Sequence, residues 1–366
     1  MEVAVCCDCL ENIGGGEYDA LVLAQEFDAD VFTPNYKPDA TFPEFKDLEV
    51  HETFDFDLPA SKGYALRKMM HSVGFMREDF SGYDALISIG MWAHFASIGD
   101  GADEHYHYDL SPNRGLYDLY DEILERQCPW QTPTYKVWAS YWKECDQSAV
   151  DSCDYIISQS ETVSERIKKY HNREPDALIY PPVDLDRFSP SDDKEDYWIM
   201  VTRIMKEKRI ELALDVLEKL PVSEKLVVCG GAPDYYRDWE EAVIDRMGGM
   251  KNVDYRGRVE DEELAELYAQ AKGSLHLGIN EDFGLGPPES SASNTPALAV
   301  KEGGFRETVD HEENGVLVEE PYLEELKKAI EAWDMYNFDD DLVKYAEKYS
   351  ADRFRREWRE LIEDAG

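Results

Sequence analysis

The sequence predicts an α/β protein with two Rossmann-like, parallel-sheet domains that face a common cleft. Its 366 residues exceed one domain of ordinary size and suit two. Short apolar runs alternate with helical patterns along the chain, which indicates parallel strands joined by helices. A proline-containing and then polar segment at 181–196 interrupts this alternation. We therefore expect an N-terminal domain over 1–185 and a C-terminal domain over 186–345, with ligands bound beyond the carboxyl ends of the strands.

The first half begins with an apolar run, Val3–Leu10, followed by Gly14-Gly15-Gly16 and a helical pattern over Glu17–Phe27. This order predicts a strand, a glycine loop and a helix. A further helix is predicted at Val163–Tyr170. Further strands are predicted at Ala29–Phe32, Ala85–Ile89, Tyr155–Ser158 and Ala177–Tyr180. The aromatic-rich run 130–142 favours a core helix, and a sugar-facing or lipid-facing surface is the alternative.

The second half repeats the alternation from Trp198 onward. Its predicted strands are Trp198–Val201, Lys225–Cys229, Val253–Arg256, Ser274–Leu277 and Ala297–Val300. Its predicted helices are Ile210–Leu220, Asp261–Gln270, one near Pro288–Ser293, one from Phe305, and a long segment over Asp339–Asp364.

Charge is the unusual property of the composition. Asp and Glu number 79 against 38 Lys and Arg, which gives a formal net charge of −41 spread over the whole chain. Self-repulsion of this size destabilises a compact state in dilute buffer, whereas molar salt shortens the screening length to about 3 Å. We therefore expect adaptation to high internal salt. The same charge argues against nucleic-acid binding, which requires basic surface, and against electrostatic docking to anionic lipid.

The sequence also predicts the cellular location and the role of the cysteines. No run of 18 apolar residues is present, and Met1–Val5 lacks the basic start of a signal peptide, so a cytoplasmic protein is expected. The seven cysteines are scattered, and Cys6, Cys7 and Cys9 have no partners at zinc spacing. We interpret these three as small buried apolar residues.

A basic cluster follows the first strand of the second half. Arg203 and Lys208 come directly after Trp198–Val201. Arginine can clamp two phosphate oxygens at once, and lysine acts as a point charge. The cluster is therefore a candidate phosphate site, and a solvated basic turn on an acidic surface is the alternative.

A second candidate is the segment Glu281–Glu289, which follows the strand Ser274–Leu277 and leads into a helix that opens with prolines. Gly284 and Gly286 allow a ligand to approach the backbone closely. The positive end of the new helix then points at the cleft.

Two glycine turns indicate a function less specifically than the basic cluster and the segment Glu281–Glu289 do. A dinucleotide-binding Gly-x-Gly-x-x-Gly starting at Gly14 would place its last glycine at Asp19, so the fingerprint is absent and NAD binding is disfavoured. Gly303-Gly304 also joins a strand to a helix and is by itself an ordinary turn.

In their order, these segments resemble glycosyltransferase family 4 of the GT-B fold, over about residues 190–350. Within the family, Glu281–Gly284 and Ile179–Asp184 most resemble the O-antigen mannosyltransferase-like subgroup. The matching elements are Arg203 with Lys208, Gly230-Gly231, Asn252–Val259, the Glu-x7-Glu element Glu281–Glu289, Thr295-Pro296 and Gly303-Gly304. The first half is more divergent, although Gly15-Gly16 and Asp151–Phe188 are similar to family segments.

The resemblance implies a retaining glycosyltransferase that moves a hexosyl group, mannosyl or glucosyl, from a nucleotide-diphosphate sugar to a glycan or lipid-linked acceptor, without a metal or other cofactor. It implies that Arg203 and Lys208 hold the diphosphate, that Glu281 contacts hydroxyls of the transferred sugar and that Glu289 binds the ribose. The other implied donor-binding residues are Asp282, Phe283, Gly284 and Leu285 beside the sugar, Gly230, Arg258 and Val259 on the nucleotide side, and Gly15 and Gly16 from the other domain. The helix 346–366 resembles the terminal segment that returns to the first domain.

The first domain departs from the family pattern. Where the subgroup often has a histidine before Ser/Thr-Pro, this chain has Gln131, which can hydrogen-bond but cannot shuttle a proton. Gln131 and His94 are the candidate acceptor-side residues; alternatively His94, His105 and His107 are surface or satisfied polar residues. A GT-B nucleotide-sugar epimerase and a non-catalytic nucleotide-sugar or glycan-binding protein remain alternative functions, and a peripheral membrane contact stays open.

Overall fold

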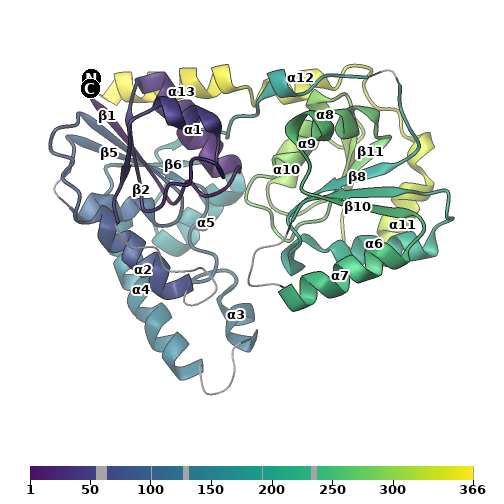
Figure 1. Cartoon of the computed structure of the whole chain (residues 1–366), viewed down its shortest axis with the longest axis horizontal. Helices are drawn as coiled ribbons and strands as arrows, with labels where there is room; N and C mark the ends of the chain where they lie inside the picture. The colour runs from purple at the N-terminus through teal and green to yellow at the C-terminus, as the bar shows by residue number, and fades with distance from the viewer. Residues whose placement is uncertain (55–63, 100, 127–131, 192, 232–236, 366) are drawn as a thin grey trace. The chain divides into compact units, whose positions relative to one another are not determined.

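The computed structural model describes residues 1–54, 64–99, 101–126, 132–191, 193–231 and 237–365. The chain divides into two compact units (Figure 1). Unit 1 comprises Met1–Pro181 with Phe354–Gly366, and unit 2 comprises Pro182–Arg353. The chain passes from unit 1 to unit 2 near the predicted domain boundary at 185. It returns to unit 1 at Phe354, which is after the predicted start of the returning segment at 346. Each unit is an α/β domain on a parallel sheet, so the predicted fold class is confirmed.

In the part of unit 1 that the structure describes, seven strands form one sheet and all pair in parallel. The strands are β1 (Val3–Cys7), β2 (Asp30–Thr33), β3 (Val50–Glu52), β4 (Ala85–Ile89), β5 (Glu104–Asp109), β6 (Tyr155–Ser158) and β7 (Ala177–Leu178). Their order across the sheet is β3-β2-β1-β4-β5-β6-β7. The helices are α1 (Gly15–Phe27), α2 (Tyr64–Phe75), α3 (Tyr120–Arg126), α4 (Thr132–Ser152), α5 (Glu161–His171) and α13 (Ala351–Ala365), with 3-10 turns η1 (Pro43–Asp47) and η3 (Ala93–Ile98).

The core of unit 1 follows from strand alternation. Successive side chains of β1 and β4 point to opposite faces of the sheet, so Val5 and Ile87 pack with α1 and α13, whereas Cys6 packs with α2 and η3. Helix α13 contributes Phe354 and Trp358, both fully buried, at helical spacing. The C-terminal helix therefore completes a core whose strands lie hundreds of residues earlier.

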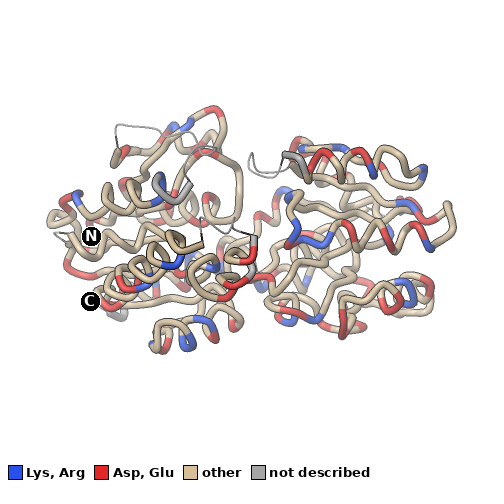
Figure 2. The backbone as a smooth tube through the Cα atoms, turned by 90° about the horizontal axis from the view of Figure 1, so that it is seen from below, with Lys and Arg blue, Asp and Glu red and all other residues tan. Residues whose placement is uncertain are grey.

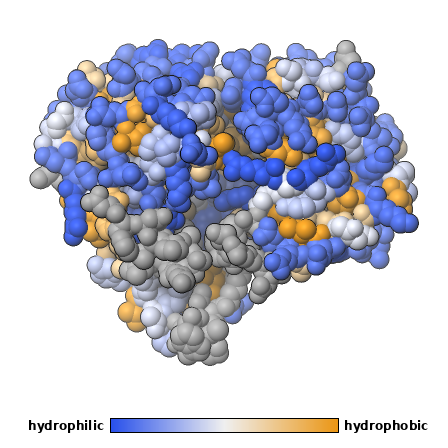
Figure 3. Space-filling view, in the orientation of Figure 1, coloured by the Kyte–Doolittle hydropathy of each residue, from blue (hydrophilic) through white to orange (hydrophobic). Residues whose placement is uncertain are grey.

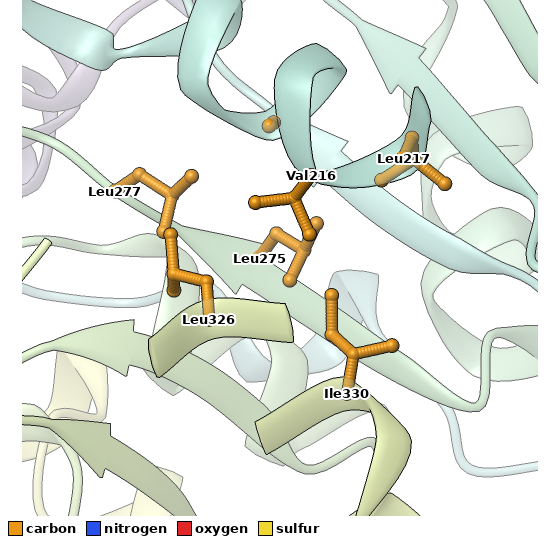
Figure 4. A pocket seen from close by; sticks show the side chains of 7 residues that line it. Val216, Leu217, Leu275, Leu277, Leu326 and Ile330 are labelled. Atoms are coloured by element: carbon orange, nitrogen blue, oxygen red, sulfur yellow. The ribbon is translucent and has the colours of Figure 1, made fainter. Parts of the chain in front are cut away.

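The described residues of unit 2 form a sheet of six parallel strands. They are β8 (Trp198–Val201), β9 (Leu226–Cys229), β10 (Val253–Gly257), β11 (Gly273–His276), β12 (Ala297–Val300) and β13 (Gly315–Val318), in the order β10-β9-β8-β11-β12-β13. The helices are α6 (Ile210–Lys219), α7 (Arg237–Gly249), α8 (Asp261–Gln270), α9 (Gly286–Ala292), α10 (Phe305–Thr308), α11 (Leu323–Glu331) and α12 (Val343–Glu347), with η4 (Leu185–Arg187), η5 (Lys206–Lys208) and η7 (Trp333–Met335). Between α6, α11 and β11 lies a closely packed apolar cluster with a small cavity of about 10 Å³ (Figure 4).

Several predicted elements differ at their ends from the observed ones, three of them as follows. Strand β1 ends at Cys7 instead of Leu10, which makes an isolated bridge with Tyr36. Helix α1 begins at Gly15, so Gly15 and Gly16 lie in its first turn and not in a loop; the first N–H groups of a helix need no intrahelical partner, so glycine is tolerated there. The single C-terminal helix is also wrong, because the chain breaks between α12 and α13, where Ser350 Oγ accepts the N–H of Arg353 at 3.3 Å.

The aromatic run forms most of α4 and belongs mainly to the core. Trp142 is buried and its ring lies edge-on to Trp92, with centroids 5.7 Å apart. The same helix leaves Tyr141 62% exposed and Val137 73% exposed, so one edge of α4 is an apolar surface. Trp130 and Gln131 lie outside the described residues.

Acidic side chains are distributed over both units (Figure 2). The face seen in Figure 3 is mostly hydrophilic, with small apolar areas scattered across it. None of the helices that the structure describes combines the length and the apolar character needed to cross a bilayer.

Candidate functional site

The sheet of unit 2 has a point where the strand order reverses. From β8 the chain proceeds to β9 and β10 on one side, and then returns to β11 on the other. In open α/β sheets the crevice beyond the carboxyl ends at such a reversal is where ligands bind. The loops that meet there are 202–209 after β8 and 277–285 after β11, which we call the β8 loop and the β11–α9 loop.

The two loops meet through the predicted catalytic residues. Lys208 Nζ lies 2.6 Å from Oε1 and 2.7 Å from Oε2 of Glu281. The side chains are 19% and 22% exposed, so the pair is reachable from solvent. The N–H of Ile279 also donates to the carbonyl of Glu207 at 2.8 Å. A Cβ on Gly278 would lie 2.2 Å from Glu281 Oε2, so a larger residue at 278 would displace the carboxylate of Glu281.

Arg203 lies in the same β8 loop. It is exposed and forms no ion pair with any residue that the structure describes. Gly230, at the end of β9, has φ +131°, and an added Cβ would lie 1.9 Å from the carbonyl oxygen of Thr202. Gly230 therefore allows two loop backbones to touch beside Arg203. Arg258 and Val259 follow β10, where Arg258 is exposed and Val259 is partly buried.

The β11–α9 loop rests on the glycine pair that follows β12. The N–H of Gly304 donates to the carbonyl of Glu281 at 2.8 Å. A Cβ on Gly303 would lie 2.2 Å from that oxygen, and a Cβ on Gly304 would lie 2.2 Å from the carbonyl oxygen of Phe283. Gly303-Gly304 is thus more than an ordinary turn, because it packs against the backbone of the β11–α9 loop and supports it. Phe283 is buried, whereas Asp282, Gly284 and Leu285 are partly buried.

Glu289 lies in the first turn of α9, in a different environment from Glu281. Its Oε2 accepts the hydroxyl of Tyr268 at 3.2 Å. Burial raises the pKa of Glu289 to about 7, and the nearby guanidinium of Arg187 only partly offsets this. The carboxyl therefore changes charge near neutral pH.

Unit 1 has its own reversal of strand order, between β1 and β4. Asp8, directly after β1, accepts three backbone N–H groups of the loop after β4: Trp92 and Ala93 on Oδ1 at 2.8 and 2.9 Å, and Met91 on Oδ2 at 2.9 Å. Gly90, with φ +108°, brings its Cα against the Asp8 carboxylate. Gly15 and Gly16 lie in the adjacent start of α1. Sequence reasoning missed Asp8; its place directly after an apolar strand was the available signal.

His94 lies in η3 with its imidazole buried. Its Nε2 is 3.1 Å from Oδ1 of Asp146, and its ring centroid is 4.8 Å from that of His107. Both residues line a polar cavity of about 10 Å³, which is room for about one water. His105 and His107 are buried as well, and their ring nitrogens lie 2.8 and 3.1 Å from Ser88 Oγ. All three histidines are buried, so the surface interpretation is wrong, whereas the partners of His105 and His107 agree with the other interpretation, that of satisfied polar residues.

Among the described residues, the one group of His, Cys, Asp and Glu close enough to share a metal ion is Asp30, Glu49 and His51. These residues lie at β2 and β3 of unit 1, and none belongs to the loops of unit 2 described above. The predicted acceptor-side residue Gln131 lies outside the described residues.

Solved structures with the same architecture define the class of fold. The complex of Anabaena Alr3699/HepE with UDP and glucose superposes with a TM-score of 0.75 at 15% identity, over 100% of both chains. WaaG, a glycosyltransferase involved in lipopolysaccharide biosynthesis, gives 0.67 at 17% identity over 98% of this chain and 99% of its own. At such identities the likeness establishes the fold alone, which is GT-B.

The family follows from the sequence of unit 2. Residues 184–349 match the family model "Glycosyl transferases group 1". This segment is nearly all of unit 2. The predicted resemblance to glycosyltransferases is thereby confirmed.

Two curated relatives are similar over part of the chain. The O-antigen chain mannosyltransferase RfbU of Salmonella typhimurium is 27% identical over 195 residues, 53% of this chain and 54% of the relative. The D-inositol 3-phosphate glycosyltransferase of Mycobacterium sp. (strain JLS) is 29% identical over 194 residues, 48% and 43% respectively. The chain thus spans about half the length of the curated relatives it matches.

Proposed function

We propose that this protein is a retaining glycosyltransferase that transfers a hexosyl group, mannosyl or glucosyl, from a nucleotide-diphosphate sugar to a glycan or lipid-linked acceptor. The observation that carries the proposal is the Lys208–Glu281 pair, held at the reversal of strand order in a group 1 domain. The names of the relatives support the choice of donors: one is a mannosyltransferase, and one solved neighbour holds UDP and glucose.

The pair is suited to exchange its partners when a donor binds. A diphosphate carries more negative charge than one carboxylate, so it competes with Glu281 for the ammonium of Lys208. Glu281, once released, can accept hydrogen bonds from hydroxyls of the sugar. Arg203 is exposed beside the same loop and offers a second cation to the diphosphate. Phe283, Gly284 and Leu285 would present backbone groups to the sugar.

The same groups would stabilise the leaving group. The bond between the anomeric carbon and the phosphate oxygen breaks while the acceptor oxygen bonds to that carbon on the same face. The departing phosphate oxygen takes the acceptor's proton, and Lys208 and Arg203 stabilise the charge that develops on the diphosphate. Because these side chains already supply positive charge, we propose that no metal is required. Activity that vanishes in EDTA and returns with magnesium or manganese would contradict this.

The nucleotide is assigned to the other predicted residues. Glu289 would accept the ribose hydroxyls, and Gly230, Arg258 and Val259 would lie near the base. On the acceptor side, Gln131 and His94 remain candidates. The net charge of −41 further motivates the proposal that the protein works in concentrated salt.

The decisive assay is release of nucleoside diphosphate in molar potassium chloride, with a panel of UDP- and GDP-sugars and an acceptor extract. Wild type is compared with Glu281→Ala and with Lys328→Ala, which alters an exposed pair on α11. We expect release with one donor, dependent on acceptor, nearly lost in Glu281→Ala and kept in Lys328→Ala. Binding without any turnover, in a folded protein, would favour a binding protein, and conversion of the donor without acceptor would favour an epimerase.

A further inference from the structure

The central strand β11 has one polar face that the proposed reaction does not use. Strands inside parallel sheets are usually apolar on both faces. Here Leu275 and Leu277 point toward α6 and α11 and line the apolar cavity (Figure 4). Ser274 and His276 alternate with them and therefore point to the opposite face, although both are buried. Buried polar groups need hydrogen-bond partners, so this face requires an explanation.

A chain of hydroxyl groups fixes the proton of His276. Ser274 Oγ donates to Ser290 Oγ at 2.7 Å, and Ser290 Oγ donates to the carbonyl of Thr295 at 2.7 Å. Ser274 has one hydroxyl proton, so the 2.8 Å contact with Nε2 of His276 must be donated by the imidazole. The ring thus carries its hydrogen on Nε2 and leaves Nδ1 bare. Burial lowers the pKa of His276 to about 3, which keeps it neutral.

The other edge of the imidazole lies against the start of α9. A Cβ on Gly286 would lie 2.5 Å from Cε1 and 2.7 Å from Nδ1 of His276. Two residues earlier, a Cβ on Gly284 would lie 2.6 Å from Cε1 of Phe305. The rings of His276 and Phe305 are neighbours, with centroids 5.9 Å apart. Both glycines of the Glu281–Glu289 segment therefore pack directly against an aromatic ring, Gly286 against His276 and Gly284 against Phe305.

We propose that His276 is a positioning residue, which sets the height of the β11–α9 loop above the sheet and so places the loop backbone and Glu289 for the nucleotide sugar. The ligand in this statement rests on the proposed function, whereas the control of the loop does not. A histidine suits the task because its flat ring fits against a glycine while its Nε2–H supplies Ser274. A leucine would fill the space but leave the Ser274 oxygen without its donor.

The first test uses the ligand-free protein. Amide hydrogen exchange of residues 282–286 is measured in the full chain for wild type, His276→Ala, His276→Asn and Leu275→Val. We expect exchange in the loop to quicken about tenfold in both His276 variants, because local opening is governed by local contacts. Leu275→Val, on the opposite face of the same strand, lowers Tm but leaves loop exchange unchanged. Loop exchange unchanged in His276→Ala would overturn the proposal.

The second test uses the contact between the ring and the glycine. Gly286→Ala forces its methyl group into the imidazole, so we expect affinity for the nucleotide sugar to fall at least about tenfold. Adding His276→Ala removes the obstacle and should restore part of that affinity, even though each change alone is harmful. Losses that simply add would overturn the proposal. If wild type binds no nucleotide sugar, the proposed function fails, and the exchange measurement still decides the role of His276.

The pH profile separates positioning from proton transfer. A neutral His276 gives no titration between pH 5 and 9, so the profile of kcat/KM in His276→Asn should keep the shape of the wild type at a lower level. Loss of one limb of the profile would mean that His276 transfers a proton, which contradicts a positioning role.

Discussion

At the two reversals of strand order, the charged side chains have different kinds of hydrogen-bond partner. In unit 1, Asp8 binds three backbone N–H groups of the neighbouring loop. In unit 2, Lys208 and Glu281 pair through their side chains, both partly open to solvent. A carboxylate that holds backbone groups cannot leave without orphaning them, whereas two side chains can exchange each other for a ligand. The first arrangement stabilises a loop, and the second prepares a binding site.

The largest effect expected from this comparison is on catalysis. Lys208→Ala should lower nucleoside-diphosphate release about 10²–10³-fold, as is typical when one group that stabilises developing charge is removed. The free energy of unfolding should change by only about 0–1 kcal/mol, because partly exposed pairs contribute little. Enzyme assay and chemical denaturation at the same salt concentration measure the two quantities. A large loss of stability would mean that the pair is structural, like Asp8.

The next effect concerns Asp8 and stability. Asp8→Ala removes the acceptor of three N–H groups, so we expect the free energy of unfolding to fall by about 3 kcal/mol. Asp8→Asn keeps one acceptor oxygen and should lose about half of that. Donor binding per folded molecule should remain near wild type in both. If denaturation curves of Asp8→Ala overlay those of wild type, the loop after β4 is held by other contacts.

Glu289 gives a smaller effect that depends on pH. Its raised pKa of about 7 means that the folded protein holds this proton more tightly than the unfolded chain. The resulting stability is fully present below the unfolded pKa and is lost as pH rises toward 7. Glu289→Gln cannot ionise, so it should be more stable than wild type at pH 8, by about 1–2 kcal/mol, and similar at pH 4. Melting curves at both values check this, and a variant less stable than wild type at pH 8 contradicts the assignment.

Glu289→Gln, although more stable at pH 8, should bind the nucleotide more weakly than wild type. The proposed ribose contact needs a carboxylate that accepts hydroxyl groups, and an amide replaces one acceptor by a donor. Titration of wild type with nucleoside diphosphate at pH 6 and pH 8 should show tighter binding at pH 8.

The smallest effect is expected for an exposed ion pair. Lys328 and Glu325 on α11 are 68% and 48% exposed at 3.0 Å. Lys328→Ala should change neither activity nor stability by more than about 0.5 kcal/mol. A larger change would show that exposed pairs in this acidic chain behave unlike ordinary ones, and the contrast with Lys208 would lose its meaning.

Much of the fold could be predicted from the sequence because strands such as β8, β9 and β12 of unit 2 are apolar runs of ordinary length. Strand β5 escaped prediction because His105 and His107 interrupt its apolar pattern, although both are buried against Ser88. Alternation with Tyr106 and Tyr108 was the missed signal. Short edge strands such as β3, with three residues, carry too little pattern to be recognised.

Some residues of the candidate site could likewise be predicted from the sequence, and others could not. Lys208 and Glu281 lie 73 positions apart, yet each follows an apolar strand. Lys208 stands in a basic cluster and Glu281 opens a glycine-containing turn, so local pattern and family resemblance were enough to select both. Their direct contact was not foreseen, because it depends on which strands become neighbours. Asp8 and His276 were missed for that reason too. The place of Asp8 after an apolar strand was a local signal, but the partners of both residues depend on the order and register of the sheet, which local sequence does not contain.

The placement of α13 has a consequence for how the chain is made. Phe354 and Trp358 fill the core of unit 1, but the ribosome delivers them only after all of unit 2 has been synthesised. During translation, unit 2 can close its core while the sheet of unit 1 still exposes the apolar face that these rings cover. Unit 1 is therefore the part of the newborn chain that waits longest for its final shape, and the part with the greatest need of protection by chaperones.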